Sequence, residues 1–430
     1  MVVSFPGNLI DAQQAARAFH ERSALAAFVT GLVLNQGTIK WFGAPLPKRL
    51  RERLTKELAR RAVTLVPPDV VVSHPWLDVL RTSLSRVTTN PIYADLAWDL
   101  MSHRFDRHVA QRHLDGIHAV HAFEYTARST FEQARRRGIA TILGMPSTDS
   151  KEFDEIKKRE ELRFPELRTE HHRYFASRFT PRYERRRAEI DLADVIVANS
   201  EVTKRSHVRN GTDPGKIVVV PLGAPPPITA ITKAPPNVHE PLSVIWAGTL
   251  SVRKGAHYFI NAWRMLRGRI HASAVVYGSV DLPERILRPI PEGLEIIGSI
   301  PQQDLFGAFE KADVLVFPTL ADGFGLVITE AFSRGLPAIT TEEAGGSALV
   351  EHGRNGLIVP AADSDALVEA LRWCLDNRDA LYQMRFGALE TAKRWQWIDY
   401  RRMMVEKVSQ GLSKSGCTVD FGPEIGSEVS

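Results

Sequence analysis

The stretch Val314-Leu-Val-Phe-Pro-Thr-Leu-Ala-Asp-Gly-Phe-Gly-Leu-Val-Ile-Thr-Glu330 decides how the rest of the sequence is interpreted. Its first four residues are all apolar, which predicts a buried strand that ends at Pro318. The glycines that follow allow the backbone to approach a ligand closely, and we expect Gly325 and Leu326 to begin a helix. The free N–H groups of such a helix start favour an anion. A buried strand, a short loop and a helix form the repeating unit of a doubly wound α/β sheet.

The same alternation of short apolar runs and helical patterns extends along both halves of the chain, which predicts two mainly parallel sheets covered by helices. The strands expected in the first half are Val2–Phe5, one within Leu25–Leu34, Gly116–Ala122, Ile139–Leu143 and Val195–Ala198. Those expected in the second half are Ser243–Ala247, Ala274–Tyr277, Leu294–Ile297, Val314–Phe317, Ala338–Thr340 and Gly356–Val359. Helices are expected at Asp11–Arg22, Tyr125–Arg137, Pro181–Leu192, Ala256–Leu266, Gln303–Lys311, Leu326–Arg334 and Ser364–Asn377.

A proline-rich segment separates the two halves. Six prolines fall within the 17 residues 225–241, and such a segment continues neither a helix nor a central strand. The alternative is a surface loop inside one domain. We expect two Rossmann-like domains that face a cleft, at residues 1–228 and 229–395. A helix at 396–412 is expected to cross back to the first domain, and the Ser- and Gly-rich end at 413–430 is expected to be disordered.

The composition is that of a globular enzyme, with 44% hydrophobic and 24% charged residues in a chain of 430. The longest apolar run, Leu25–Leu34, is too short to span a membrane, and the N-terminus lacks the positive charge of a signal peptide. Two cysteines provide neither a disulfide framework nor metal-ligand spacing, so a cytoplasmic location is expected. Residues 1–230 hold 35 Lys and Arg against 26 Asp and Glu, a net charge of +9, whereas the remainder carries −4.

A second loop at the carboxyl end of a strand contains two adjacent cations. Arg253 and Lys254 lie between the strand that ends near Ala247 and the next helix, where side-chain charge and backbone N–H groups can hold a diphosphate together. The loop has neither the spacing of a P-loop nor that of a dinucleotide fingerprint. Taken alone, an Arg-Lys pair is also typical of a solvated surface.

Two carboxylates, Asp322 and Glu330, flank the anion-favouring helix start. They would repel a diphosphate unless they face hydroxyl groups, and sugar and ribose hydroxyls are their natural partners. The alternative is an N-capping aspartate with a surface glutamate. In the third loop, Gly345-Gly346 again permits close approach, and Asn355-Gly356 is typical of a structural turn.

Together these loops resemble the C-terminal domain of the GT-B-fold glycosyltransferases of family 4, the group 1 transferases. The resemblance extends over roughly residues 244–373. The first half is similar to the family more weakly, from Ala193 to Ser200 and from Lys216 to Gly223. The matching pieces are Gly248-Thr-Leu, Arg253-Lys-Gly, Ala312-Asp-Val-Leu-Val-Phe-Pro318, Gly323-Phe-Gly-Leu, Glu330-Ala, Gly335-Leu-Pro, Gly345-Gly and Asn355-Gly.

The resemblance implies a retaining transferase that takes a sugar from a nucleotide-sugar donor and needs no cofactor and no bound metal. The helix start and the cations would stabilise the departing diphosphate. Glu330 would bind the ribose, and Asp322, in the first place of the family's Glu-x(7)-Glu element, would contact the donor sugar; both are catalytic candidates. The diphosphate ligands would be Arg253 and Lys254 with Gly325 and Leu326, and Phe324 would add a backbone contact to the sugar.

The chain departs from the family pattern at three positions. Asp322 is one methylene shorter than the usual glutamate, and Thr249 replaces a common arginine. Phe123 stands where the family often has a catalytic histidine, which leaves His121 as the catalytic candidate or as a buried structural histidine. These departures keep a second interpretation open, a degenerate GT-B domain that binds a nucleotide or a partner without catalysis.

The resemblance implies that the first domain binds the acceptor, a saccharide or a lipid-linked molecule. Two features of its sequence bear on this expectation. Gly7-Asn8 resembles a shortened acceptor-side loop, with a plain tight turn as the alternative. Residues 47–62 combine leucines at every fourth position with seven Lys and Arg, which fits peripheral contact with an anionic membrane at its inner face. The alternative is an amphipathic helix packed on its own domain. No nucleic-acid-binding motif is present.

Overall fold

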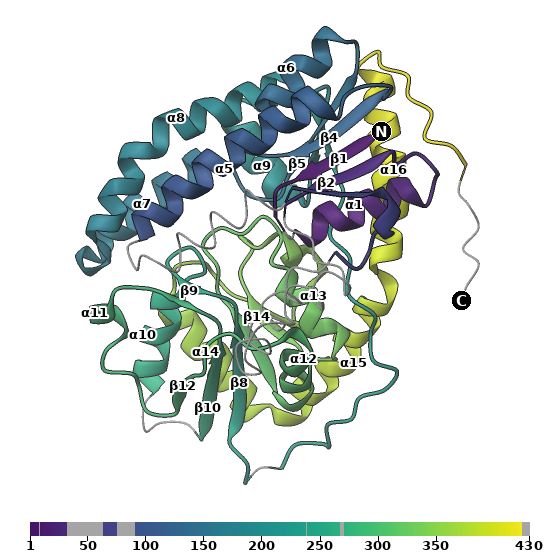
Figure 1. Cartoon of the computed structure of the whole chain (residues 1–430). Helices are drawn as coiled ribbons and strands as arrows, with labels where there is room; N and C mark the ends of the chain where they lie inside the picture. Colours follow the sequence, from purple (N-terminus) through teal and green to yellow (C-terminus); the bar gives the residue numbers. More distant parts are fainter. Residues whose placement is uncertain (8, 32–62, 75–90, 238, 267–270, 424–430) are drawn as a thin grey trace, which may run out of the picture.

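The computed structural model describes residues 1–7, 9–31, 63–74, 91–237, 239–266 and 271–423, which form two α/β domains (Figure 1). In the first, seven parallel strands pair in the order β3-β2-β1-β4-β5-β6-β7. The strands are β1 (Val2–Phe5), β2 (Ala27–Thr30), β3 (Val71–Ser73), β4 (Ala119–Phe123), β5 (Ala140–Met145), β6 (Val195–Ala198) and β7 (Ile217–Val219). The helices are α1 (Ile10–His20), α5 (Pro91–Arg112), α6 (Arg128–Arg136), α7 (Ser150–Arg163), α8 (Glu170–Leu192) and α9 (Glu201–Arg209).

The second domain has six parallel strands in the order β12-β10-β8-β13-β14-β15 and a short β9–β11 pair. The strands are β8 (Leu242–Ala247), β9 (Leu250–Ser251), β10 (Ala272–Tyr277), β11 (Val280–Asp281), β12 (Leu294–Ile296), β13 (Val314–Phe317), β14 (Ala338–Thr340) and β15 (Gly356–Ile358). The helices are α10 (Ala256–Leu266), α11 (Glu284–Leu287), α12 (Gln302–Lys311), α13 (Leu326–Ser333), α14 (Ser364–Asp376), α15 (Arg378–Arg394) and α16 (Trp397–Lys414). The α/β class and the two parallel sheets predicted from the sequence are confirmed.

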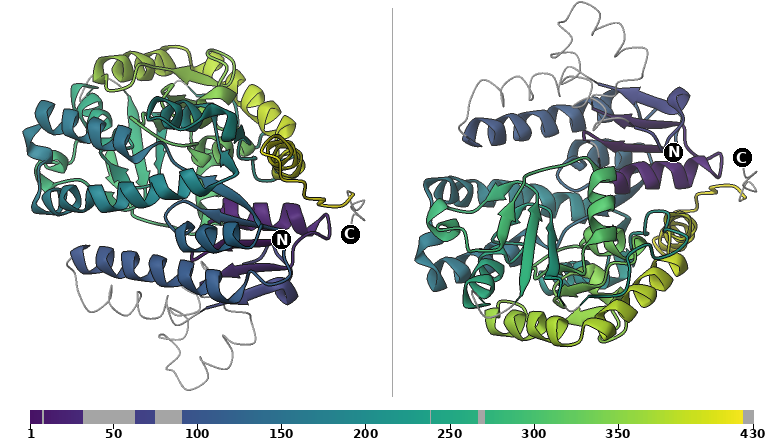
Figure 2. Two further views of the ribbon diagram at one scale, coloured as in Figure 1. Left: turned by 90° about the horizontal axis from the view of Figure 1, so that it is seen from above. Right: turned by 90° about the horizontal axis from the view of Figure 1, so that it is seen from below.

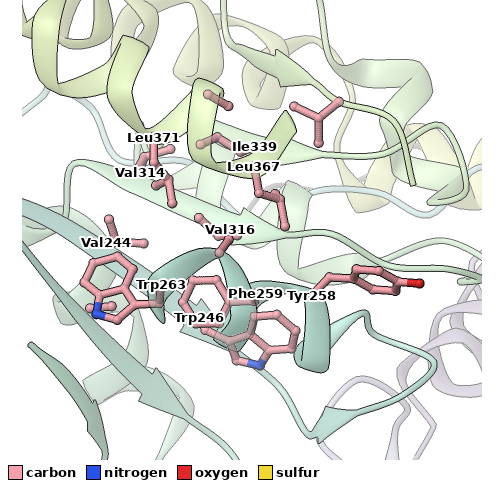
Figure 3. Close-up of a cluster of buried hydrophobic side chains, with 14 of the residues drawn as sticks. Val244, Trp246, Tyr258, Phe259, Trp263, Val314, Val316, Ile339, Leu367 and Leu371 are labelled. Carbon is pink, nitrogen blue, oxygen red and sulfur yellow. The ribbon is translucent and has the colours of Figure 1, made fainter. Parts of the chain in front are cut away.

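Each sheet is apolar on both faces because helices cover both of them. All four residues of β13 are buried, as expected for a central strand without a solvated side. Figure 3 shows one face of the second sheet, where Trp246 of β8 packs against Phe259 of α10 with ring centroids 5.4 Å apart. Because the strands are parallel, their carboxyl ends lie at one edge of the sheet, and the loop from β13 to α13 begins at this edge.

Among the helices expected from the sequence, α8 differs most from its expected bounds. The helix expected to begin at Pro181 begins at Glu170, with the proline inside it. A proline removes one backbone hydrogen bond, but ion pairs from the following turns hold this helix against α5. Arg182 pairs with Asp95 and with Asp99, and Arg185 pairs with Asp106.

The last helix, α16, returns to the first domain (Figures 1 and 2). Met404, Val408 and Leu412 are buried in the same apolar cluster as residues of α1 and β4. Its arginine Arg401 donates to Glu21 at 2.8 Å and to Gln14 at 3.1 Å. None of the helices in the described ranges is both long enough and apolar enough to cross a bilayer.

The expectation of a disordered tail from residue 413 is wrong as far as residue 423. Helix α16 continues to Lys414, and Phe421 is buried, with its ring centroid 5.0 Å from that of Phe19. A single large aromatic side chain outweighs the Ser- and Gly-rich composition around it because its burial contributes most of the local stabilisation. Residues 424–430 lie outside the described part of the chain.

We expect Phe421→Ala to lower the free energy of unfolding by about 2–3 kcal/mol, because a buried phenylalanine is lost from the α1 contact. Chemical denaturation followed by circular dichroism measures this change. Phe386→Ala removes a half-exposed phenylalanine from α15 and is the matched control, with little expected effect. Equal stabilities of the two variants would contradict the packing of the tail.

Candidate active site

The loop after β13 reaches the start of α13 through a glycine that no other residue replaces easily. Gly325 is the N-cap of α13 and has a φ of 79°, in the left-handed region. A Cβ placed on it would lie 2.7 Å from the Phe317 ring. The glycine therefore meets a conformational and a steric requirement together, and it brings the helix start against the end of β13.

Asp322 lies in this loop and holds both cations of the β9–α10 segment. Its Oδ2 accepts from Arg253 Nη1 at 3.1 Å and forms an ion pair with Lys254 Nζ, while its Oδ1 accepts from the Phe324 N–H at 3.2 Å. The ammonium of Lys254 also lies 4.5 Å from the centroid of the Phe317 ring. Since that ring contacts Gly325, the ammonium and the helix start lie beside the same side chain.

Burial and charge act on this ion pair in opposite directions. Burial alone would raise the pKa of Asp322, but Lys254 and Arg253 lower the pKa below its ordinary value. Burial lowers the pKa of Lys254, and the attraction of Asp322 offsets part of that effect. Asp322 is therefore an anchor for the two cations as much as the sugar contact that the sequence predicts.

Glu330 lies in α13 and faces a different surface from Asp322. Its Oε1 accepts from Gln302 Nε2 at 3.0 Å, and burial raises the pKa of its carboxyl to about 7. The carboxyl lines a cleft of about 1100 Å³ between the domains, together with Leu326. The rest of the wall comes from α1, from residues 64 and 65, from the linker at 224–226, from the start of α12 and from α16.

The two domains touch at the donor loop itself. The carbonyl of Gly323 accepts from Ser200 Oγ at 2.5 Å and from Thr203 Oγ1 at 3.2 Å. A Cβ on Gly323 would lie 2.3 Å from the carbonyl oxygen of Pro146. A second glycine, Gly345, would meet the hydroxyl of Ser200 in the same way. These glycines allow the backbone of the second domain to pack directly on the first.

His121, the catalytic candidate of the first domain, is fully buried in this structure, which favours the alternative of a structural histidine. Its side chain is fully buried in β4 and stacks on Phe123 with ring centroids 4.8 Å apart. Among the described residues neither ring nitrogen has a hydrogen-bond partner, and burial lowers the pKa of the imidazole to about 3. In this structure the ring is therefore closed off from solvent, and its neutral form is favoured.

The acceptor-side predictions are only partly within the described residues. Gly7 follows β1, and its carbonyl accepts from Thr30 Oγ1 at 3.4 Å. Asn8 lies outside the described residues, as do residues 47–62 with their basic leucine-rich pattern. The acceptor-side role of Asn8 and the membrane contact of residues 47–62 therefore stay predictions from the sequence.

Several residues at the site carried no signal in the sequence. Gln302 begins α12, 28 positions before its partner Glu330, and Ser200 lies 123 positions before Gly323. The cleft wall formed by α16, which includes Trp397 and Arg401, depends on the return of that helix. An amide, a hydroxyl and a tryptophan are common surface residues, so only the fold identifies them.

Comparisons with known proteins agree with this geometry. Residues 51–226 match the family model described as Glycosyltransferase Family 4, and residues 241–377 match the one described as Glycosyl transferases group 1. D-inositol 3-phosphate glycosyltransferase of Corynebacterium urealyticum is 28% identical over 250 residues, which are 50% of this chain and 57% of that protein. The amylovoran biosynthesis glycosyltransferase AmsK of Erwinia amylovora is 26% identical over 192 residues, 41% of this chain and 46% of that protein. The chain thus matches about half the length of these curated relatives.

Solved structures show the fold. The structure of Anabaena HepE in complex with UDP and glucose has a TM-score of 0.60 at 14% identity and covers 95% of this chain and 98% of that one. Sucrose-phosphate synthase from Thermosynechococcus elongatus has a TM-score of 0.64 at 16% identity and covers 96% of each chain. With two family models that span most of its length and a GT-B arrangement of two parallel sheets, the chain belongs to the family 4, group 1 glycosyltransferases.

Proposed function

We propose that the protein transfers a sugar from a nucleotide-sugar donor to a saccharide or lipid-linked acceptor. The observation that carries this proposal is the start of α13. The helix begins after Gly325, the ammonium of Lys254 lies over the Phe317 ring beside that glycine, and Glu330 follows one turn later with its carboxyl in the cleft between the domains. A helix start beside a cation favours phosphate, and a carboxyl one turn later favours hydroxyls.

The cations are held in place before any donor binds. Asp322 pairs with Arg253 and Lys254, so both long side chains lose little conformational freedom when a diphosphate arrives. The diphosphate would compete with Asp322 for the ammonium of Lys254, which burial has already stripped of part of its water. In the transfer step the same charges would stabilise the diphosphate as it leaves.

The carboxyl of Glu330 is placed to accept hydrogen bonds from a ligand rather than from other protein groups. Its carboxyl faces the cleft, and Gln302 is the one hydrogen-bond donor recorded for its side chain among the described residues. Because burial disfavours the charged form, ribose hydroxyls that donate to the carboxylate would recover hydration that the cleft withholds. We therefore place the ribose of the donor beside Glu330.

Retention of the anomeric configuration and independence of a bound metal remain part of the proposal. They follow from family membership and from the presence of protein cations where a metal would otherwise neutralise the diphosphate. Relatives named for amylovoran and colanic acid biosynthesis support a role in cell-surface polysaccharide synthesis. The Anabaena structure with UDP and glucose supports a nucleotide sugar as donor. Two cysteines without a disulfide support a cytoplasmic location.

The carboxylate of Asp322 already has Arg253 and Lys254 as partners, and His121 is fully buried. Both observations favour a second candidate, a domain that binds nucleotide without transfer. The two candidates agree on the nucleotide site and differ on turnover. A panel of nucleotide sugars read by thermal shift identifies the ligand for both. Binding of a nucleoside diphosphate without hydrolysis or transfer of any donor would favour the second.

Lys254→Ala should reduce kcat/KM by roughly 10²–10³-fold, because a preorganised charge on the leaving diphosphate is lost. Glu330→Gln should mainly raise KM. Donor hydrolysis and transfer are measured with the nucleotide sugar found by thermal shift, and nuclear magnetic resonance of the product identifies its anomer.

Lys393→Ala is the matched control for Lys254→Ala, since it removes the same charge from an exposed position of α15. It should retain full activity. Unchanged activity of both Lys254→Ala and Glu330→Gln would falsify the site, and an inverted product would contradict retention. Loss of transfer in a chelator, with restoration by added metal, would contradict metal independence.

Glu330→Gln should stabilise the free protein at alkaline pH although it weakens donor binding. The pKa of this carboxyl rises from its ordinary 4.5 to about 7 on folding, so the wild-type protein loses stability as the pH rises through this window. The neutral amide loses none. We expect the variant to be more stable by roughly 1 kcal/mol at about pH 8 and equal to wild type near pH 4. A constant stability difference across this range would contradict a ligand-facing, desolvated carboxylate.

Membrane contact through residues 47–62 is proposed from the sequence alone. Sedimentation with vesicles that contain anionic lipid should recover the wild-type protein at low salt and release it at high salt. Replacing Arg60 and Arg61 by Gln should weaken this binding, whereas the same change at Arg136 and Arg137, at the end of α6, provides a control pair. No sedimentation of the wild-type protein at low salt would remove the proposal.

A further inference from the structure

Three histidines meet in the first domain, in a cluster separate from the donor loop and the cleft. His74 directly follows β3, His108 lies in the last turns of α5, and His113 comes just after that helix. Each side chain is partly buried. The backbone N–H of His74 donates to the carbonyls of Thr30 at 3.0 Å and Gly31 at 3.1 Å, so this residue is fixed to the end of β2.

The ring nitrogens of the cluster converge. One nitrogen from each histidine lies within 4.8 Å of the other two, and Nε2 of His74 lies 3.2 Å from Nε2 of His113. Two imidazole nitrogens bound to one tetrahedral zinc ion at about 2.0–2.1 Å are roughly 3.3 Å apart. The pair His74 and His113 already has this separation, and a ring nitrogen of His108 lies within 4.8 Å of both.

A hydrogen bond between histidines explains only part of this arrangement. It accounts for the pair His74 and His113, which can share one proton, but it does not account for the nitrogen of His108 near both. The ring of His108 lies 3.9 Å from that of His74 and 5.3 Å from that of His113, between centroids. Three imidazole nitrogens that approach one another without a cation stabilise the fold little, whereas one metal ion can accept a lone pair from each of them.

The donor set defines the class of metal. Three imidazoles, with no carboxylate in the group, suit zinc, nickel, cobalt or copper and do not suit magnesium or calcium, which prefer oxygen ligands. Burial, and for two of them a neighbouring histidine, lowers the pKa of each imidazole and favours the neutral form that binds metal. The nearby cation Arg112 acts in the same direction on His108.

We propose that His74, His108 and His113 bind one divalent transition metal ion, zinc by preference, with water in the fourth position. The ion would fasten the end of the edge strand β3, a strand of three residues, to the end of α5. It would act on stability and would take no part in sugar transfer, so the proposal does not rest on the proposed function.

The test uses untagged full-length protein that has been freed of metal with a chelator. Equilibrium dialysis against zinc should give one bound ion per chain, and cobalt should give the absorption spectrum of a tetrahedral site. Added zinc should raise the melting temperature because it binds only the folded site. His74→Ala and His113→Ala should each weaken zinc binding by more than the roughly 10-fold that loss of a supporting group costs.

His118→Ala is the matched control, because this histidine is exposed, lies a few residues after His113 and is outside the cluster. It should bind zinc as tightly as wild type. If His74→Ala does not fold, His108→Ala on the solvent-facing part of α5 provides the same comparison. Absence of stoichiometric zinc binding by the wild-type protein, or equal zinc affinity in His74→Ala, His108→Ala and wild type, would overturn the proposal.

Discussion

The ion pair between Asp322 and Lys254 is the interaction on which the proposed donor site depends. It joins the loop after β13 to the loop before α10, two segments that the chain separates by 68 positions. Removing Asp322 would leave two cations without their common counter-charge, and breaking a buried pair in this way costs about 3–5 kcal/mol. Because Arg253 shares the same carboxylate, one aspartate sets the position of both cations.

The contact between the domains uses the same loop. The hydroxyl of Ser200 accepts from the Thr203 N–H as the N-cap of α9 and donates to the carbonyl of Gly323. The start of a helix in the first domain is therefore tied to the loop that holds the cations in the second. At the opposite connection, Gly223 of the linker packs on the backbone of Gln396 and Trp397, where the chain returns into α16. The chain therefore passes between the domains twice at one place, in the linker near Gly223 and at the start of α16. A change in the angle between the domains would act both on the loop before α13 and on the wall of the cleft.

The elements that the sequence predicted best are those with one dominant constraint. Val195–Ala198, Val314–Phe317 and Ala338–Thr340 were predicted to the residue, because a short apolar run in a doubly buried sheet has sharp ends. The features that were predicted wrongly or left open involve long-range contacts. The start of α8, the packing of Phe421 and the burial of His121 depend on partners far along the chain, which a local pattern does not contain. The same limit hid the histidine cluster, since His74 and His108 come from different elements with no recognisable ligand spacing.

The two carboxylates of the Glu-x(7)-Glu-like element differ in what surrounds them, and this difference separates their roles. Asp322 is surrounded by two cations and a backbone N–H, and its pKa is lowered, so it stays charged as part of the protein's own framework. Glu330 is partly buried at the wall of the cleft beside a single amide, and burial raises its pKa to about 7, so its charged form is less well solvated than that of a free carboxylate. Spacing along the chain made them look equivalent. Because a desolvated carboxylate is relieved either by a proton or by hydroxyl groups that donate to it, the proposed contact with the ribose falls to Glu330, whereas Asp322 already has its partners within the protein.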